Sequence, residues 1–155
     1  MRTTLRGLAG CVLLGGVATA ASIGQSAVAV EPSTRTAHTS TCKINDGVAT
    51  TGSPVGANPV RYEYGNSPYV GARYNSCTDV IKVYFGGYTN LTHYNVIRGA
   101  RQYELAPGPA RVWMITPASW DYVATFSAQG CVRGDWPQPS RCTRWSPTVS
   151  VNVIH

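Results

Sequence analysis

The sequence predicts an all-β protein built as an antiparallel sandwich or barrel, and three observations carry this prediction. Short runs of alternating apolar and polar residues recur along the chain, which is the pattern of half-buried strands. Turn signals separate these runs, among them Gly86-Gly87, Pro107-Gly108-Pro109 and Pro137-Gln138-Pro139. After the N-terminal segment, no window shows the sustained i, i+3, i+4, i+7 spacing of an amphipathic helix.

The N-terminus has the layout of a secretory signal peptide. Arg2 and Arg6 give it a positive start, and residues 7–24 carry no charge and are mostly apolar. Ala27-Val28-Ala29 then supplies the small residues of a cleavage site. We therefore expect residues 1–29 to be removed on export, and the mature protein to be secreted and extracellular, with no membrane span left after cleavage.

The mature chain is expected to consist of a flexible leader and one disulfide-bonded domain. Residues 30–41 are rich in Ser, Thr and Pro without apolar periodicity, whereas residues 42–154 have the length of a single domain. Loss of the signal peptide removes Cys11 and leaves an even number of cysteines, which predicts two disulfides with three possible pairings. These cysteines are Cys42, Cys77, Cys131 and Cys142.

Each expected strand follows from apolar residues at every second position, because successive side chains of a strand point to opposite faces. In chain order the aligned residues are Val60, Tyr62 and Tyr64; Ile81, Val83 and Phe85; Val112 and Met114, which alternate with Arg111, Trp113 and Ile115; Tyr122, Ala124, Phe126 and Ala128; and Val149, Val151 and Val153. The chain shows no internal repeat.

The segment from Ala110 to Val151 resembles a fibronectin type III domain. At the end of strand E and the start of strand F that family carries a Leu-x-Pro-…-Tyr sequence. Here Ile115-Thr116-Pro117-Ala118-Ser119-Trp120-Asp121-Tyr122 takes that place, and Phe126 and Ala128 continue the strand. The last strand of the family is similar to Trp145-Ser146-Pro147-Thr148-Val149-Ser150-Val151.

The resemblance implies an immunoglobulin-like, fibronectin type III-like β-sandwich, with its type III-like part at residues 77–154. Val80 to Phe85 would be strand B, and Tyr94-Asn95-Val96 would open strand C. Residues 42–74 have no clear counterpart beyond a possible first strand. Trp145 would be a structural residue at the start of the last strand.

The same resemblance implies further structural roles. Tyr122 would be the tyrosine-corner residue, whose hydroxyl ties the corner between strands E and F to upstream backbone. Cys131 would pair with Cys142 and clamp the loop between strands F and G, and Cys42 would pair with Cys77 at the start of strand B.

The sequence predicts neither catalysis nor a cofactor. The histidines outside the signal peptide, His38, His93 and His155, are scattered, and no nucleophile motif or paired-carboxylate motif accompanies them. No pair of Cys or His residues has metal-ligand spacing, so no metal site is expected. The formal net charge is +6, but without a basic cluster or a nucleic-acid motif we expect no nucleic-acid partner.

The most specific short motif is Arg133-Gly134-Asp135, the adhesion tripeptide, in the loop 132–141 between two cysteines. Asp135 could complete a metal coordination sphere in a receptor, and Arg133 could pair with a carboxylate through its planar fork. Gly134 permits the tight turn between them. The alternative is a chance tripeptide in an ordinary turn, since the chain is rich in Arg and Gly.

Aromatic residues supply a second binding signal. Trp113, Tyr122, Phe126 and Trp145 are expected in the core or packed on strands. Trp120, Trp136, Tyr69 and Tyr88 lie near predicted turns and are expected at the surface, where Trp and Tyr suit stacking on sugars or protein binding. The alternative is that they cover sheet edges and Arg side chains.

Together these observations predict a secreted, non-catalytic binding or adhesion module. Its partner would be an extracellular or cell-surface protein or polysaccharide, contacted by the loop 132–141, with Arg133, Gly134, Asp135, Trp136 and Trp120 as the binding residues. Three alternatives stay open: a secreted enzyme whose site is assembled in space, a protease inhibitor that presents Arg133 or Arg141 as bait, and a structural envelope protein.

Overall fold

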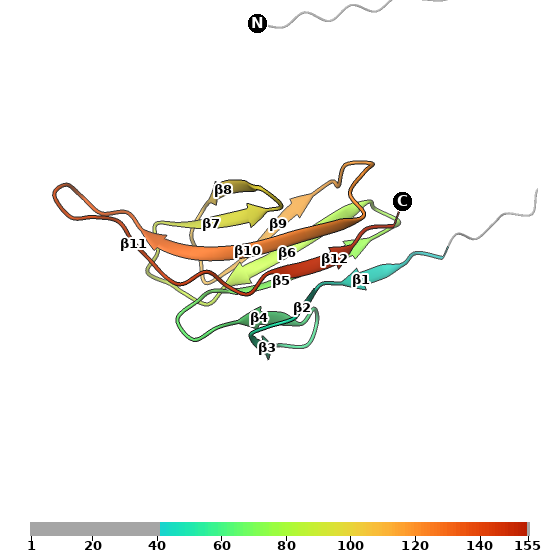
Figure 1. The fold of residues 1–155 in the computed structure, drawn as a ribbon, viewed down its shortest axis with the longest axis horizontal. Coiled ribbons are helices and arrows are strands. Elements are labelled where there is room, and N and C mark those ends of the chain that lie inside the picture. The colour runs from blue at the N-terminus through green and yellow to red at the C-terminus, as the bar shows by residue number, and fades with distance from the viewer. Residues whose placement is uncertain (1–40, 155) are drawn as a thin grey trace, which may run out of the picture. The chain divides into compact units, whose positions relative to one another are not determined.

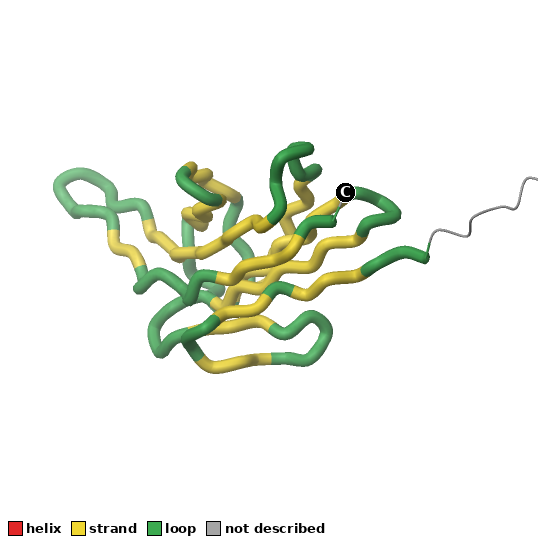
Figure 2. The backbone as a smooth tube through the Cα atoms, turned by 45° about the vertical axis from the view of Figure 1, so that its right-hand side comes forward, coloured by secondary structure: helices red, strands yellow, loops and turns green. Residues whose placement is uncertain are grey.

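Strands with one apolar face must bury that face against another layer, and this chain does so with two antiparallel sheets. The computed structural model describes residues 41–154, which belong to one compact unit of strands and loops without a helix (Figures 1 and 2). The predicted all-β sandwich is therefore confirmed. The predicted signal peptide and the leader up to residue 40 lie outside the described residues.

The first sheet contains six strands. They are β1 (Ile44–Asp46), β3 (Ser53–Val55), β4 (Arg61–Glu63), β5 (Tyr69–Asn75), β6 (Val80–Gly86) and β9 (Ala110–Ile115). Their order is β3-β4-β5-β6-β9, and β1 also pairs with β5. The segment before residue 75 thus contributes the centre of this sheet.

The second sheet also contains six strands. They are β2 (Val48–Ala49), β7 (His93–Arg98), β8 (Arg101–Leu105), β10 (Val123–Val132), β11 (Arg141–Cys142) and β12 (Val149–Asn152). Their order is β2-β12-β10-β7-β8, and β11 pairs with the far end of β10.

The strands expected as B, C, E, F and G are divided between the two sheets as in an immunoglobulin-like sandwich. The strands expected as B and E, β6 and β9, are neighbours in the first sheet. Those expected as C, F and G, which are β7, β10 and β12, lie side by side in the second. An immunoglobulin-like sandwich divides these strands between its two sheets in the same way.

The core lies between the sheets and consists of the inward residues of the paired strands. Phe85 of β6 and Tyr94 of β7 meet edge to face with ring centroids 5.1 Å apart, and Trp113 of β9 meets Phe126 of β10 at 6.5 Å. These contacts link the two sheets directly, since each joins one strand from each layer. The other buried core residues include Val70, Ala72, Tyr74, Ile81, Val83, Val96, Ala124, Ala128, Val149, Val151 and Val153.

The prediction that Tyr122 packs in the core as a tyrosine corner is wrong. Its side chain is 75% exposed, because β10 begins one residue later and Tyr122 already lies beyond the end of the core. Buried hydroxyls that tie a strand to distant backbone belong instead to Tyr74, which donates to the carbonyl oxygen of Ile154 at 2.9 Å, and to Tyr94. The Tyr94 hydroxyl donates to the carbonyl oxygen of Gly108 at 3.0 Å, and the carbonyl oxygen of Tyr88 lies 3.3 Å from the same hydroxyl.

Trp145 is half-buried and precedes the last strand rather than opening it, since β12 begins at Val149. The residue after it explains the delay. Ser146 is buried, and both its backbone N–H and its hydroxyl are bonded to the backbone of Ala128 at 2.8 Å. This segment therefore follows β10 through a side chain before the regular ladder starts.

Both disulfides join the cysteines that the family resemblance implied. Cys42 pairs with Cys77 and ties the segment before β1 to the turn between β5 and β6. Cys131 pairs with Cys142 and joins the end of β10 to β11. Closing loops of 35 and 11 residues stabilises the fold by about 4 and 3 kcal/mol in the chain-entropy model.

We predict that Tyr94→Phe lowers the free energy of unfolding by about 1 kcal/mol, because it leaves a part-buried carbonyl oxygen without its donor. Urea denaturation measures this change. The matched control is Tyr122→Phe at an exposed phenol, for which a change within about 0.5 kcal/mol is expected. Equal effects of the two variants would contradict the role given to the Tyr94 hydroxyl.

The free energy of unfolding at alkaline pH should depend on the Tyr94 phenol. Burial raises the pKa of Tyr94 above its ordinary value. Above about pH 10 the unfolded phenol ionises while the folded one stays protonated, so stability present below that pH is lost as the pH rises. Tyr94→Phe should therefore lose less stability than the unmodified chain over that range.

Candidate functional site

The loop 132–141 forms a hairpin that extends beyond the sandwich. It starts where β10 leaves the core, and Figure 1 shows it projecting past the sheets at the left. Its base is held by the Cys131–Cys142 disulfide and by the pairing of Val132 with Arg141. The hairpin is therefore fixed at both of its ends to the most extensively paired strand of the second sheet.

Hydrogen bonds order the inside of the hairpin. The N–H of Gln138 donates to the carbonyl oxygen of Asp135 at 2.6 Å, which closes a turn, and the N–H of Gly134 donates to the Ser140 hydroxyl at 3.3 Å. Gly134 is packed so closely that a Cβ atom there would run into the carbonyl oxygen of Gln138 and the backbone of Pro139. The glycine is thus required for the two arms to approach each other.

The first arm of the hairpin is anchored to the neighbouring strands. The N–H of Arg133 donates to the Thr92 hydroxyl at 2.8 Å, and its guanidinium pairs with the Glu104 carboxylate at 2.6 Å. The ring of His93 lies 4.0 Å from the other oxygen of Glu104. The guanidinium of the Arg133-Gly134-Asp135 tripeptide is therefore already engaged within the protein.

The tip of the hairpin is open to solvent. Trp136 is 95% exposed, as predicted, and Asp135 is exposed beside it. Within residues 41–154, Asp135 takes part in none of the ion pairs. The structure thus brings four of the five predicted binding residues together, with an indole and a carboxylate presented outward.

Trp120, the fifth predicted binding residue, lies at the other end of the sandwich. It precedes β10, whereas the hairpin follows it, and a strand of ten residues is about 30 Å long. Trp120 is 75% exposed, which agrees with its predicted surface position. It cannot share one small contact surface with the hairpin tip.

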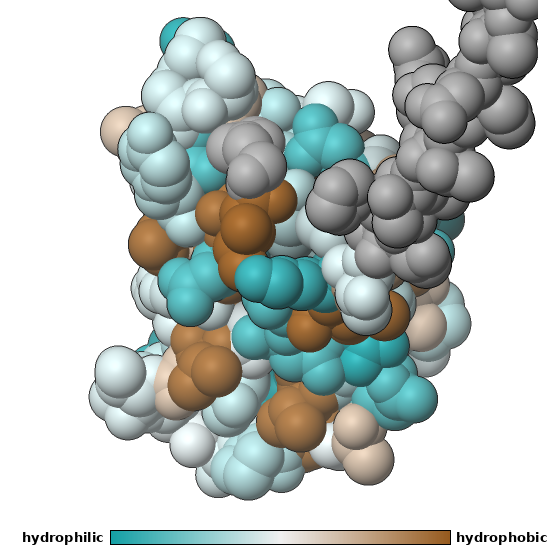
Figure 3. Space-filling view, turned by 90° about the vertical axis from the view of Figure 1, so that its right-hand side faces the viewer, coloured by the Kyte–Doolittle hydropathy of each residue, from teal (hydrophilic) through white to brown (hydrophobic). Residues whose placement is uncertain are grey.

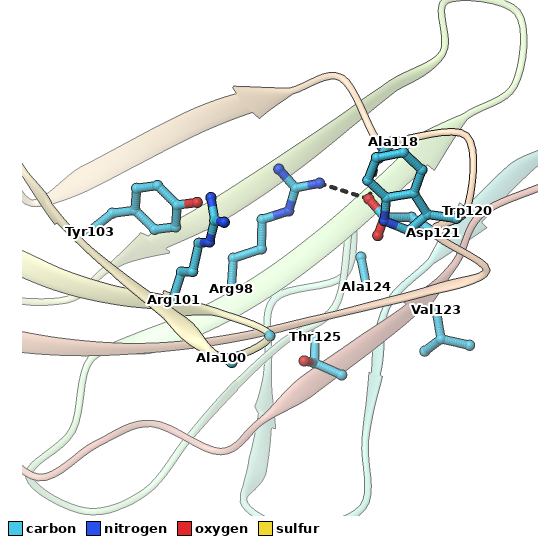
Figure 4. Close-up of a pocket in the computed structure, with 11 residues that line it drawn as sticks. Arg98, Ala100, Arg101, Tyr103, Ala118, Trp120, Asp121, Val123, Ala124 and Thr125 are labelled. Atoms are coloured by element: carbon cyan, nitrogen blue, oxygen red, sulfur yellow. Dashed lines mark hydrogen bonds and ion pairs between the residues drawn. The ribbon is translucent and has the colours of Figure 1, made fainter.

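A pocket of about 470 Å³ lies beside Trp120 and was not predicted (Figure 4). It is formed by the turn between β7 and β8, the loop before β10, and the first residues of β10. Its charged and aromatic groups come from Arg98, Arg101, Tyr103, Trp120 and Asp121.

The loop that carries Trp120 is fixed by its neighbour Asp121. The Asp121 carboxylate accepts from the N–H of Ala118 at 2.9 Å and pairs with the Arg98 guanidinium at 2.7 Å. The N–H of Asp121 in turn donates to the carbonyl oxygen of Ala118 at 2.9 Å. One carboxylate therefore closes the turn and holds it against β7.

The pocket lies where β7 and β8 extend beyond the end of the core, so that their inward-facing residues are no longer covered by the other sheet. On β7 these positions are Tyr94, Val96 and then Arg98, and the residue paired with Arg98 on β8 is Arg101. An arginine at an apolar parity is a signal that the sequence does contain. This signal predicts a charged site only when residues 101–105 are known to form a strand that pairs with β7.

Comparison with known proteins gives no match: no family model matches the sequence, and no curated protein or solved structure is significantly similar to the chain. In the described part of the chain, no three His, Cys, Asp or Glu side chains are grouped so that they could hold a metal ion. The same residues contain no helix that could cross a membrane.

We predict that Gly134→Ala opens the hairpin and costs about 1–3 kcal/mol, because the new methyl group overlaps backbone that cannot move away cheaply. Hydrogen exchange of the hairpin amides and the thermal midpoint measure the two effects. Gly65→Ala is the matched control, since a Cβ atom at Gly65 meets nothing within 4 Å. Unchanged exchange in the Gly134 variant would show that the hairpin is not ordered as described.

Proposed function

We propose that this protein is an exported, non-catalytic binding module that contacts a protein partner through the tip of the 132–141 hairpin. The observation that carries the proposal is Trp136, whose side chain is 95% exposed on a hairpin held by a disulfide, internal hydrogen bonds and an ion pair. The two disulfides support export, because such bonds persist in oxidising compartments.

An indole held in water at the end of an ordered loop favours partner binding. Trp is strongly enriched among residues that dominate binding energy, because it buries a large area when a partner covers it. An ordered hairpin also loses little conformational freedom on binding, so more of the contact energy remains as affinity. The sandwich thus supplies a rigid base for a projecting aromatic contact.

The adhesion tripeptide has a divided role in this proposal. Asp135 lies beside Trp136 and is available as an oxygen ligand or hydrogen-bond acceptor for the partner. Arg133 acts as a positioning residue through Glu104. Because that ion pair is exposed, it contributes about 1 kcal/mol or less, and a partner carboxylate can displace Glu104 on binding.

The geometry supports a binding module more strongly than a protease inhibitor. An inhibitor would present a basic side chain on an accessible loop backbone. Here Arg133 is tied to Glu104, Arg141 lies in β11 paired with Val132, and the tip is formed by Trp136 and its neighbours.

We also propose that the chain is a relative of fibronectin type III domains. The support is the division of the expected strands between the sheets, together with the short motifs around Pro117 and Trp145. The proposal concerns the fold alone, since such sandwiches carry many functions.

We predict that Trp136→Ala weakens partner binding by about 30-fold or more, which corresponds to a binding hot spot of about 2 kcal/mol. The purified chain is immobilised, proteins from the envelope and culture fluid of the source are captured, and the dissociation constant of the purified partner is measured by calorimetry. Trp120→Ala, an exposed tryptophan at the other end of the sandwich, is the matched control and should bind normally.

Three outcomes would overturn this proposal. A partner that binds the Trp136 variant and the unmodified chain equally would place the site elsewhere. Failure of the chain to bind any protein would favour a structural role. Inhibition of a trypsin-like protease that is lost in Arg133→Ala or Arg141→Ala would identify an inhibitor.

A further inference from the structure

We propose that the pocket beside Trp120 is a second binding site, which takes an anionic saccharide unit at the end of the sandwich opposite the hairpin. The pocket has a volume of about 470 Å³, is partly open to solvent, and is lined by residues of the second sheet and of the loop before β10. The proposal is independent of the hairpin, because it uses none of the hairpin residues.

The charged groups of the pocket favour an anionic ligand. Arg98 and Arg101 face each other directly across β7 and β8, and like charges in that position destabilise a sheet. Asp121 neutralises Arg98, but Arg101 takes part in none of the ion pairs among residues 41–154. The pocket therefore holds two guanidinium groups against one carboxylate, which favours an anionic ligand.

The chemistry of the ligand follows from the unpaired guanidinium. Its planar fork matches the oxygens of a carboxylate or a phosphate, with which it forms two parallel charge-assisted hydrogen bonds. Figure 4 shows the side chains of Arg98 and Arg101 pointing into the same space, with Arg101 beside the phenol of Tyr103. An anionic group placed there would relieve the repulsion between the two arginines.

Trp120 favours a sugar as the ligand, because its indole is 75% exposed at the edge of the pocket. The turn closed by Ala118 and Asp121 holds its backbone, so the ring is presented by an ordered loop. In Figure 4, Trp120 and Tyr103 lie at opposite sides of the pocket with the guanidinium groups between them. A flat apolar ring at the edge of a polar site suits stacking on a sugar ring.

A saccharide fits this site better than an acidic peptide or a protein surface. The apolar residues that line the pocket are small, namely Ala100, Ala118, Ala124 and Val123, and form no deep apolar hole for a peptide anchor. Figure 3 shows the described residues from the right-hand side of Figure 1. On this face, apolar residues form separate patches divided by hydrophilic ones. A ring that carries an acidic group uses both features that the pocket offers, the indole face and the free guanidinium.

The test uses tetragalacturonate as the probe, with its carboxyl-reduced, neutral form as the matched ligand. We expect the unmodified chain to bind tetragalacturonate with a dissociation constant of about 1 mM or tighter, and the neutral form at least tenfold more weakly. Raising the salt concentration should weaken the binding, because exposed charges are screened. Glucose 6-phosphate is the competitor that separates the two anions: competition shows that the pocket also accepts a sugar phosphate, and no competition shows a preference for the carboxylate.

Two variants and two matched controls locate the site. Arg101→Gln should weaken binding by about tenfold or more, and Trp120→Ala by about fivefold or more. Arg111→Gln removes the same charge from an exposed position on β9 outside the pocket, and Trp136→Ala removes an exposed indole from the hairpin; both should bind the probe normally. Circular dichroism confirms that each variant is folded.

Any of four results would overturn the proposal. These are no binding of tetragalacturonate at millimolar concentration, equal binding of the neutral form, undiminished binding by the Arg101 and Trp120 variants, and equally tight binding of tetraglutamate. The last result would show that the site recognises acidic peptides. None of them affects the hairpin proposal, which the Trp136 variant tests separately.

Discussion

Strand β10 pairs with β7, β11 and β12, and its inward residues Ala124, Phe126 and Ala128 are buried between the sheets. This burial and the pairing on both sides fix the strand between its two exposed ends. Because β10 is ten residues long, both of its ends leave the core. One end continues into the hairpin and the other begins at the loop that carries Trp120. The two candidate sites are therefore positioned by the same strand. Both depend on the pairing of β10 with its neighbours.

The two ends of the sandwich are stabilised in different ways. At the hairpin, a disulfide and the Arg133–Glu104 ion pair replace the apolar packing that a projecting loop lacks. At the pocket, Asp121 closes a turn and holds Arg98 at the same time. In both places polar contacts order the backbone while an indole remains exposed. The two proposed binding surfaces lie beyond opposite ends of a strand about 30 Å long, so a protein partner and an anionic glycan would not compete for the same surface.

Much of the fold could be predicted from the sequence, because strands such as β6 and β12 alternate large apolar and polar residues. The missed strand β5 buries Val70, Ala72 and Tyr74, but the small residues Gly71 and Ala72 at its centre weaken the alternation of apolar and polar residues. The grouping of the candidate residues in the hairpin was predictable because they are contiguous between two cysteines. The pocket was not, because it joins Arg98 to Asp121 across strands whose pairing no local pattern reveals.

We propose that one rigid sandwich carries two separate binding surfaces. Chemical-shift mapping of the isotope-labelled chain tests it most directly, with the captured protein partner and tetragalacturonate titrated in turn. We expect the protein partner to shift the amide signals of residues 132–141 and the saccharide to shift those of residues 98–101 and 118–121. Neither ligand should displace the other. Overlapping sets of shifted amides, or shifts confined to the faces of the sheets, would contradict it.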